Sequence, residues 1–277
     1  MERITFTKMT GSGNDFILID NRRGTFDTDR CAQFVRKVCR RQLSVGADGV
    51  IFIEDDPECD FRWRFFNADG GEAEMCGNGS RCAARFAVLN GIAPKERLAF
   101  RTLAGIIRAE VSGIRVKVQM TEPFDHQPDV HVEAAGKDFS GDFINTGVPH
   151  FVVFLSDEVS WLDFDVVRFG RALRYHERFQ PAGTNVNFAV VAADGTLRVR
   201  TYERGVEDET LACGTGSIAA ALTAFERGWV SPPVSVETRG GEILTIHFRK
   251  EGERFLDVFL EGDARVVYEG RLWEETL

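Results

Sequence analysis

The sequence predicts an α+β fold made of two related halves. Segments typical of β-strands outnumber helical segments along all 277 residues, and few strands alternate with helices as they do in a parallel α/β sheet. A cysteine–glycine segment, with the same kind of strand before it and helix after it, also occurs once in each half. Hydrophobic residues make up 43% of the chain, so a sizeable buried core is possible.

The first half is predicted to contain mainly strands and two helices. Short runs of β-branched and aromatic residues predict strands at Ile4–Thr10, Phe16–Asp20, Val50–Glu54, Phe61–Asn67, Leu98–Thr102 and Ile114–Met120. One helix is predicted over Thr28–Arg41, because its apolar residues recur at helical spacing, and the other over Asn78–Asn90.

The second half repeats this composition. Strands are predicted at Phe143–Leu155, Asn185–Val191, Leu197–Glu203, Val234–Thr238, Ile243–Phe248 and Arg254–Leu260. Helices are predicted over Asp163–Tyr175 and Thr215–Arg227. Between the halves, Thr121–Gly141 contains two prolines and several charges, and we place the domain boundary there.

The repeat becomes clear when Cys76 is aligned with Cys213. EAEMCGNGSRCAA then falls on ETLACGTGSIAAA, and both segments follow a predicted strand. Each following helix stops at a glycine, Gly91 or Gly228, fifteen positions after its cysteine. A common loop–helix junction found twice by chance is the alternative; two related units, each with a cysteine at a helix start, are the simpler account.

A cysteine at a helix start suits proton transfer. The first N–H groups of a helix are unpaired and carry partial positive charge, which lowers the pKa of a thiol and binds a carboxylate. If the two units face each other, one thiolate can remove the α-proton of an amino acid while the other thiol delivers a proton to the opposite face. We therefore expect Cys76 and Cys213 to invert a stereocentre, and no lysine motif for pyridoxal phosphate is recognisable.

Composition argues against several other classes of protein. The net charge of −9 and the absence of a long Lys/Arg run disfavour nucleic-acid binding, and no apolar stretch is long enough for a membrane span. The six cysteines include no CxxC pair, which disfavours a structural metal site. Because the first residues also show no apolar signal core, we expect a cytosolic protein with reduced thiols. Four of them are predicted to be buried packing residues, namely Cys31, Cys39, Cys59 and Cys82.

At these residues the sequence closely resembles the diaminopimelate epimerase family. The resemblance covers nearly the whole chain and rests on GSGNDF (Gly11–Phe16), GADG (Gly46–Gly49), FNADGGEAEMCGNGSRC (Phe66–Cys82), GVPH (Gly147–His150), GTNVNF (Gly183–Phe188) and YERGVEDETLACGTG (Tyr202–Gly216). It implies cofactor-independent interconversion of LL- and meso-diaminopimelate, in the synthesis of lysine and peptidoglycan precursors. It also implies a homodimer of chains with two pseudo-symmetric domains, each a mostly antiparallel sheet wrapped around a central helix. The domains are expected at residues 1–120 and 121–265, with a final strand, 266–277, returning to the first.

The resemblance also implies roles for individual residues. Cys76 and Cys213 match the acid–base pair, His150 and Glu203 match residues that tune the thiols, and Tyr268 matches a dimer contact. Residues that match substrate-binding positions are Asn14, Asn67, Gly77, Asn78, Asn185, Glu203, Arg204, Gly214 and Thr215. Two positions depart from the family pattern: Val148 stands where Asn is frequent, and Gly49 stands where some members have Gln.

Simpler interpretations exist for three of these residues. His150 could cap a strand turn, Asn14 could be an Asx-turn residue, and Glu203 with Arg204 could be a surface ion pair. At the level of function, the alternatives are a proline- or hydroxyproline-type racemase and a non-enzymatic thiol redox sensor. We also expect oxidation to join Cys76 to Cys213 and to stop turnover.

Overall fold

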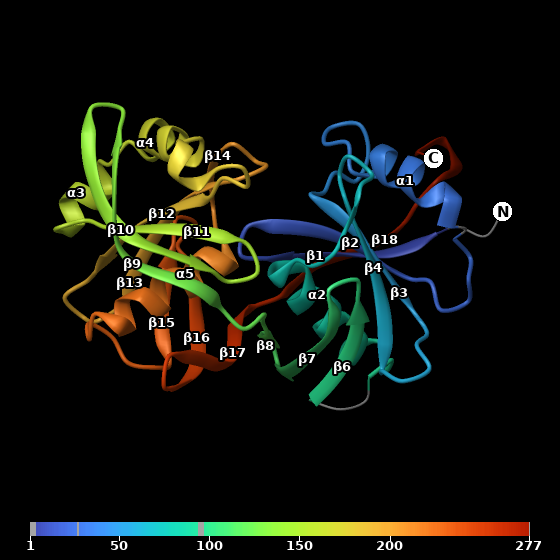
Figure 1. Ribbon diagram of the computed structural model, residues 1–277. Helices are drawn as coiled ribbons and strands as arrows, with labels where there is room; N and C mark the ends of the chain where they lie inside the picture. The colour runs from blue at the N-terminus through green and yellow to red at the C-terminus, as the bar shows by residue number, and fades with distance from the viewer. Residues whose placement is uncertain (1–3, 27, 94–96, 277) are drawn as a thin grey trace. The chain divides into compact units, whose positions relative to one another are not determined.

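The computed structural model describes residues 4–26, 28–93 and 97–276. The chain forms two compact units, Met1–Val118 with Gly262–Leu277, and Gln119–Glu261. Each unit is a mostly antiparallel sheet around a buried helix, as predicted (Figure 1). Within the described residues, no helix is both long enough and apolar enough to cross a membrane.

The sheet of the first unit has the order β18-β1-β2-β3-β4-β6-β7-β8. Its strands are β1 (Thr5–Gly11), β2 (Asn14–Asp20), β3 (Gly49–Glu54), β4 (Phe61–Asn67), β5 (Glu72–Ala73), β6 (Arg97–Thr102), β7 (Gly105–Ser112), β8 (Arg115–Gln119) and β18 (Arg265–Arg271). The pairs β2–β3 and β4–β6 are parallel, and the others are antiparallel. The connections between the parallel strands contain α1 (Thr28–Val38) and α2 (Gly77–Leu89), because parallel neighbours need a long crossover.

The sheet of the second unit has the order β9-β10-β11-β12-β13-β15-β16-β17. Its strands are β9 (Phe124–Ala134), β10 (Lys137–Asn145), β11 (Pro149–Phe154), β12 (Asn185–Val191), β13 (Leu197–Glu203), β14 (Asp208–Thr210), β15 (Val234–Thr238), β16 (Ile243–Glu251) and β17 (Arg254–Asp263). The helices are α3 (Glu158–Leu162), α4 (Val166–Arg174), η1 (Glu177–Phe179) and α5 (Gly214–Glu226), and a short η2 (Glu274–Thr276) follows β18. The parallel pairs are β11–β12 and β13–β15.

The two sheets match strand for strand. The two parallel pairs occupy the same places in each order, and α2 and α5 lie in equivalent crossovers. In this correspondence β18 takes in the first unit the place that β9 takes in the second. Figure 1 shows β18, in red, beside blue β1, because the end of the chain pairs with its beginning. The repeat detected around the two cysteines therefore extends to the topology of both units.

The two central helices are buried because their inner residues are small. In α5, Ala219, Ala220 and Ala221 are each fully buried, so the sheet strands can approach the helix closely. Both helices end in left-handed glycines as predicted, with φ of 65° at Gly91 and 73° at Gly228. The N–H groups of the glycine and of the next residue then bond back to the last helical turn in each case, which satisfies its free carbonyls.

Several predicted boundaries were wrong. The apolar run Phe143–Leu155 was expected to be one strand but forms parts of β10 and β11. Thr146–Val148 interrupts it, because Gly147 has a φ of 105° and its N–H donates to Asn145 Oδ1 at 3.0 Å. Two strands were not predicted, namely β7 and β9, and β9 lies within Thr121–Gly141, where we placed the domain boundary. Of the four cysteines expected to be buried, Cys59 is only partly buried.

Candidate active site

Cys76 occupies the N-cap of α2. Its φ of −148° and ψ of 115° are extended, and its Sγ accepts a hydrogen bond from the Gly79 N–H at 3.4 Å. As the N-cap residue it lies at the positive end of the helix, and because its side chain is partly exposed, a bound group can reach the sulfur. This geometry can stabilise a thiolate through both an N–H donor and the helix dipole.

Cys213 occupies the N-cap of α5. Its φ of −122° and ψ of 110° are again extended, and its Sγ lies 3.5 Å from Thr215 Oγ1. Cys213 is 8% exposed and so is the more buried of the two thiols. The helix start is held in place from outside, since Thr146 Oγ1 donates to Thr215 O at 3.0 Å.

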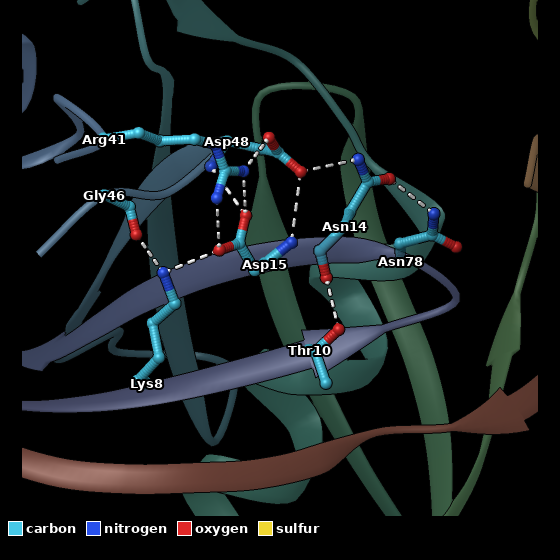
Figure 2. Close-up of polar contacts among 8 residues, drawn as sticks. All are labelled: Lys8, Thr10, Asn14, Asp15, Arg41, Gly46, Asp48 and Asn78. Atoms are coloured by element: carbon cyan, nitrogen blue, oxygen red, sulfur yellow. Dashed lines mark hydrogen bonds and ion pairs between the residues drawn. The ribbon is translucent and has the colours of Figure 1, made fainter. Parts of the chain in front are cut away.

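The first-unit residues Asn14 and Asn78 are joined side chain to side chain (Figure 2). Asn78 Nδ2 donates to Asn14 Oδ1 at 2.6 Å, and Asn14 Nδ2 donates to Asp48 Oδ2 at 3.0 Å. Asn14 begins β2, and Asn78 lies in the first turn of α2 next to Cys76. Sequence positions that are 64 residues apart are thus connected at one helix start.

The orientation of both amides is determined by the two ends of this chain of bonds. Arg81, fully buried, donates from Nη2 to Asn78 Oδ1 at 3.0 Å, and a guanidinium can only donate. At the other end, Asp48 is a carboxylate that can only accept when ionised. The oxygen of Asn78 must therefore face Arg81, and the nitrogen of Asn14 must face Asp48. Asn14 is more than an isolated Asx-turn residue, because its side chain is part of a directed network.

Charged groups behind Asp48 complete the network in Figure 2. Arg41 Nη2 donates to Asp48 Oδ1 at 2.8 Å and to Asp15 Oδ1 at 2.6 Å. Lys8 Nζ lies 2.7 Å from Asp15 Oδ2 and also bonds the Gly46 carbonyl. Burial raises the pKa of Asp15, but hydrogen bonds from Arg41 and Lys8 outweigh this and leave the pKa below its ordinary value. The GSGNDF and GADG segments are therefore two sides of one ionic network.

In the second unit, His150 is a buried residue of the parallel strand pair β11–β12. His150 pairs with Asn185 in the register of these strands and is fully buried. Burial, together with the charge of Arg204, lowers its pKa to about 3, although a hydrogen bond with Asn187 acts in the opposite direction. His150 is therefore neutral near pH 7, and its position inside the sheet does not match a residue that only caps a turn.

Asn185 and Arg204 are connected through backbone groups. Asn185 Nδ2 donates to the Pro149 carbonyl at 3.0 Å, and its Oδ1 accepts the Arg204 N–H at 2.8 Å. The Arg204 guanidinium donates from Nη1 to the Ala182 carbonyl at 2.9 Å. Burial raises the pKa of Glu203, partly opposed by a hydrogen bond from Thr210. Glu203 and Arg204 thus have separate surroundings, in contrast to a simple surface ion pair.

The other predicted site residues lie at element ends. Gly77 and Gly214 are the first residues of α2 and α5, and Thr215 follows in α5. Asn67 ends β4 with an exposed side chain, and Tyr268 lies on β18 with 44% of its surface exposed.

Sequence reasoning missed four supporting residues, Asp48, Arg81, Thr146 and Asn187. For Arg81 a signal was available. In the repeat it aligns with Ile218, so a charged residue takes a position that is apolar in the other half. Within the described residues, no group of three or more His, Cys, Asp or Glu side chains could hold a metal ion.

Comparison with solved structures defines the class of fold. The chain resembles a PhzF-family phenazine biosynthesis protein from Bacillus anthracis, with a TM-score of 0.77, 16% identity and coverage of 99% of this chain and 100% of that one. It resembles a hydroxyproline epimerase from Agrobacterium vitis with a TM-score of 0.72, 17% identity and coverage of 98% and 91%. At this level of identity the likeness concerns the fold, which is the two-unit fold of these proteins.

Comparison of sequences then identifies the family. The family model described as diaminopimelate epimerase matches residues 6–124 and 143–267. A diaminopimelate epimerase of Aquifex aeolicus is 51% identical over 98% of this chain and 99% of its own length. One from Archaeoglobus fulgidus is 46% identical over 98% and 96%. The chain belongs to the diaminopimelate epimerase family.

Proposed function

We propose that this protein interconverts LL- and meso-diaminopimelate by moving one proton at the α-carbon, without a cofactor. The observation that carries the proposal is the pair of N-cap cysteines, Cys76 and Cys213, in a chain of the diaminopimelate epimerase family. The fold and the sequence relatives support an isomerase of the lysine and peptidoglycan precursor route.

In this mechanism the α-carboxylate is bound by helix-start N–H groups. Gly77 and Asn78 supply such donors at α2, and Gly214 and Thr215 supply them at α5. Free N–H groups at a helix start bind anions because they are unpaired and lie at the positive end of the dipole. As the α-proton leaves, negative charge spreads into the carboxylate, and the same donors stabilise it.

The proton balance requires two thiols in opposite states. One cysteine, as thiolate, takes the α-proton from one face and becomes a thiol. The other, as thiol, gives its proton to the opposite face and becomes a thiolate, so the configuration inverts and the pair is left ready for the reverse reaction. A single base would tend to return the proton to the face from which it came. His150 and Glu203, whose pKa values are shifted by burial, are proposed to tune the thiols.

The distal half of diaminopimelate is itself a zwitterionic amino acid. We assign its recognition to Glu203 and Arg204, whose opposite charges suit the ammonium and carboxylate groups. Asn14, Asn67 and Asn185 add amide groups that can both donate and accept. The network around Asn14 supports this role, because it determines which amide atoms remain free for a ligand.

Hydrogen exchange at the α-carbon tests the substrate. In deuterated water, the purified protein should introduce deuterium into LL-diaminopimelate and convert it to the meso form. L-Proline, offered in parallel, should stay unlabelled. Deuterium entering only proline would establish the proline- or hydroxyproline-type racemase instead, and labelling of neither amino acid would leave the thiol redox sensor.

We also propose a cytoplasmic homodimer. A chain with six cysteines, two of which are proposed to react as thiols, is suited to a reducing compartment. On β18, Val267 and Tyr268 are 56% and 44% exposed, and Tyr268 packs edge-on against Phe6 with ring centroids 5.9 Å apart. Light scattering should give twice the chain mass of 31.0 kDa, and Tyr268→Glu should reduce it to one chain. Fractionation of the native cell would test the compartment.

A further inference from the structure

His150 has two ring nitrogens, and the structure determines which of them carries the proton. His150 Nδ1 lies 3.1 Å from Asn187 Nδ2, and this contact alone does not say which atom donates. The answer depends on the orientation of the Asn187 amide, because its nitrogen can only donate and its oxygen can only accept.

The Phe151 carbonyl sets that orientation. Asn187 Nδ2 lies 3.3 Å from Phe151 O, and a backbone carbonyl can only accept. If the amide were turned over, its oxygen would face the Phe151 carbonyl oxygen in a buried place, and the carbonyl would lose this hydrogen bond, at a cost of about 1–3 kcal/mol. Thr201 Oγ1, 2.9 Å from Asn187 Oδ1, does not discriminate, since a hydroxyl can donate or accept.

Packing holds the amide in this position. Asn187 is fully buried, and its Oδ1 lies so close to the first turn of α5 that a Cβ on Gly216 would be 2.3 Å from it. Asn187 therefore lies between His150 and the helix start that carries Cys213. Because one Nδ2 hydrogen is directed to Phe151 and the other to His150, the Nδ1 atom of His150 must be the acceptor.

We infer that Asn187 is a positioning residue that holds His150 as the neutral tautomer protonated on Nε2, so that His150 offers the reaction a hydrogen-bond donor and not a base. Nε2 is buried and has no hydrogen-bond partner among the described residues, so its N–H is free for an anionic group. The neighbouring positive charge of Arg204 opposes conversion of the ring to imidazolium. The role of His150 as a donor in the reaction rests on the proposed function, whereas the assignment of its Nε2–H tautomer does not.

Nitrogen NMR of the histidine rings tests the tautomer directly. Protonated and unprotonated ring nitrogens have well-separated ¹⁵N shifts, and His150→Gln assigns the signal among the five histidines. We expect protonated Nε2 and unprotonated Nδ1, unchanged between about pH 5 and pH 8. Protonation on Nδ1, or titration within that range, would overturn the inference.

Two variants then test Asn187 as the cause. Asn187→Asp replaces the donor with an acceptor, so the proton should move to Nδ1 or the ring should become charged. Thr201→Val removes the hydroxyl that contacts Asn187 Oδ1 but does not set the orientation of the amide, so the Nε2–H tautomer should persist. The other four histidines report whether each variant is folded. An unchanged His150 signal in folded Asn187→Asp would refute the role of Asn187.

Kinetics connect the tautomer to the reaction. In Asn187→Asp, kcat for diaminopimelate should fall on the order of 10²-fold with little change in KM, since a donor to the developing charge is lost. Thr201→Val should keep most of its activity. If Asn187→Asp changes the tautomer but not kcat, the donor role is wrong. Failure of the wild-type protein to turn over diaminopimelate would instead refute the proposed function and leave the tautomer result standing.

Discussion

Two glycines at equivalent positions of the repeat should respond differently to the same substitution. Gly79 and Gly216 each lie three residues after the cysteine, in the first turn of the central helix. A Cβ at Gly216 would lie 2.3 Å from Asn187 Oδ1 and 3.1 Å from Thr201 Oγ1. A Cβ at Gly79 would instead meet Ile51 Cδ1 at 3.3 Å, and this is the end of a flexible side chain.

These distances give a magnitude. In Gly216→Ala, the helix and Asn187 must separate by about 1 Å to reach ordinary van der Waals contact. Such overpacking destabilises the fold by about 1–3 kcal/mol, and loss of a buried hydrogen bond destabilises it by about 1 kcal/mol more. The higher helix propensity of alanine stabilises the variant by about 1 kcal/mol. We expect a net loss of about 2 kcal/mol. In Gly79→Ala a shift of a few tenths of an ångström suffices, so the change should stay within about 1 kcal/mol of zero.

Urea denaturation of both variants and the wild-type protein, followed by circular dichroism, measures the difference. The midpoint of Gly216→Ala should be clearly lower than that of Gly79→Ala, at a similar dependence on urea. The epimerase activity of Gly216→Ala should also fall, because Gly214 and Thr215 lie in the displaced turn. Equal midpoints for the two variants would refute the reasoning that Gly216 is packed more tightly than Gly79.

Four further predictions follow from the site. Cys76→Ser and Cys213→Ser should each lower epimerisation by about 10²- to 10⁴-fold with an unchanged circular dichroism spectrum, and near-normal activity in either would exclude the two-base scheme. A thiol oxidant such as diamide should join Cys76 to Cys213 and abolish turnover, whereas peptide maps of inactive protein with both thiols free would contradict this. Asp48→Ala removes the acceptor that orients Asn14, so KM for diaminopimelate should rise by about tenfold, and a KM unchanged in a folded variant would argue against the network. Burial raises the pKa of Glu203 in the folded state, so its contribution to stability is fully present below the unfolded pKa and is lost as the pH rises through the folded pKa. Glu203→Gln should therefore gain stability relative to the wild-type protein as the pH rises above about 4. A difference in thermal unfolding that does not depend on pH would contradict this.

Much of the fold could be predicted from local patterns. The bounds of Phe61–Asn67, Asn185–Val191 and Leu197–Glu203 as strands were predicted without error, because each is a dense run of β-branched and aromatic residues between turn residues. The central helices were predicted to within one residue at each end, since glycines mark both ends. The break between β10 and β11 was missed because it depends on one glycine with positive φ inside an apolar run.

The supporting residues of the site could not be predicted in this way. Arg81 bonds Ser12 at 2.7 Å across 69 sequence positions, and Asn14 bonds Asp48 across 34. Such pairs are brought together by strand order and by the burial of α2, not by spacing along the chain. The sequence shows that Asn187 is an asparagine in a strand, but only its contact with a carbonyl and a histidine reveals what it does.

The sequence by itself therefore determined the repeat, the two cysteines that begin its helices, and the family, because these depend on residue types at fixed short spacings. The tertiary structure decided the orientation of the site. It showed that a buried arginine and a carboxylate direct the amides of Asn14 and Asn78, and that a carbonyl directs Asn187 and through it His150. Which atom donates and which accepts is determined by the atoms that are in contact, and folding alone brings those atoms together.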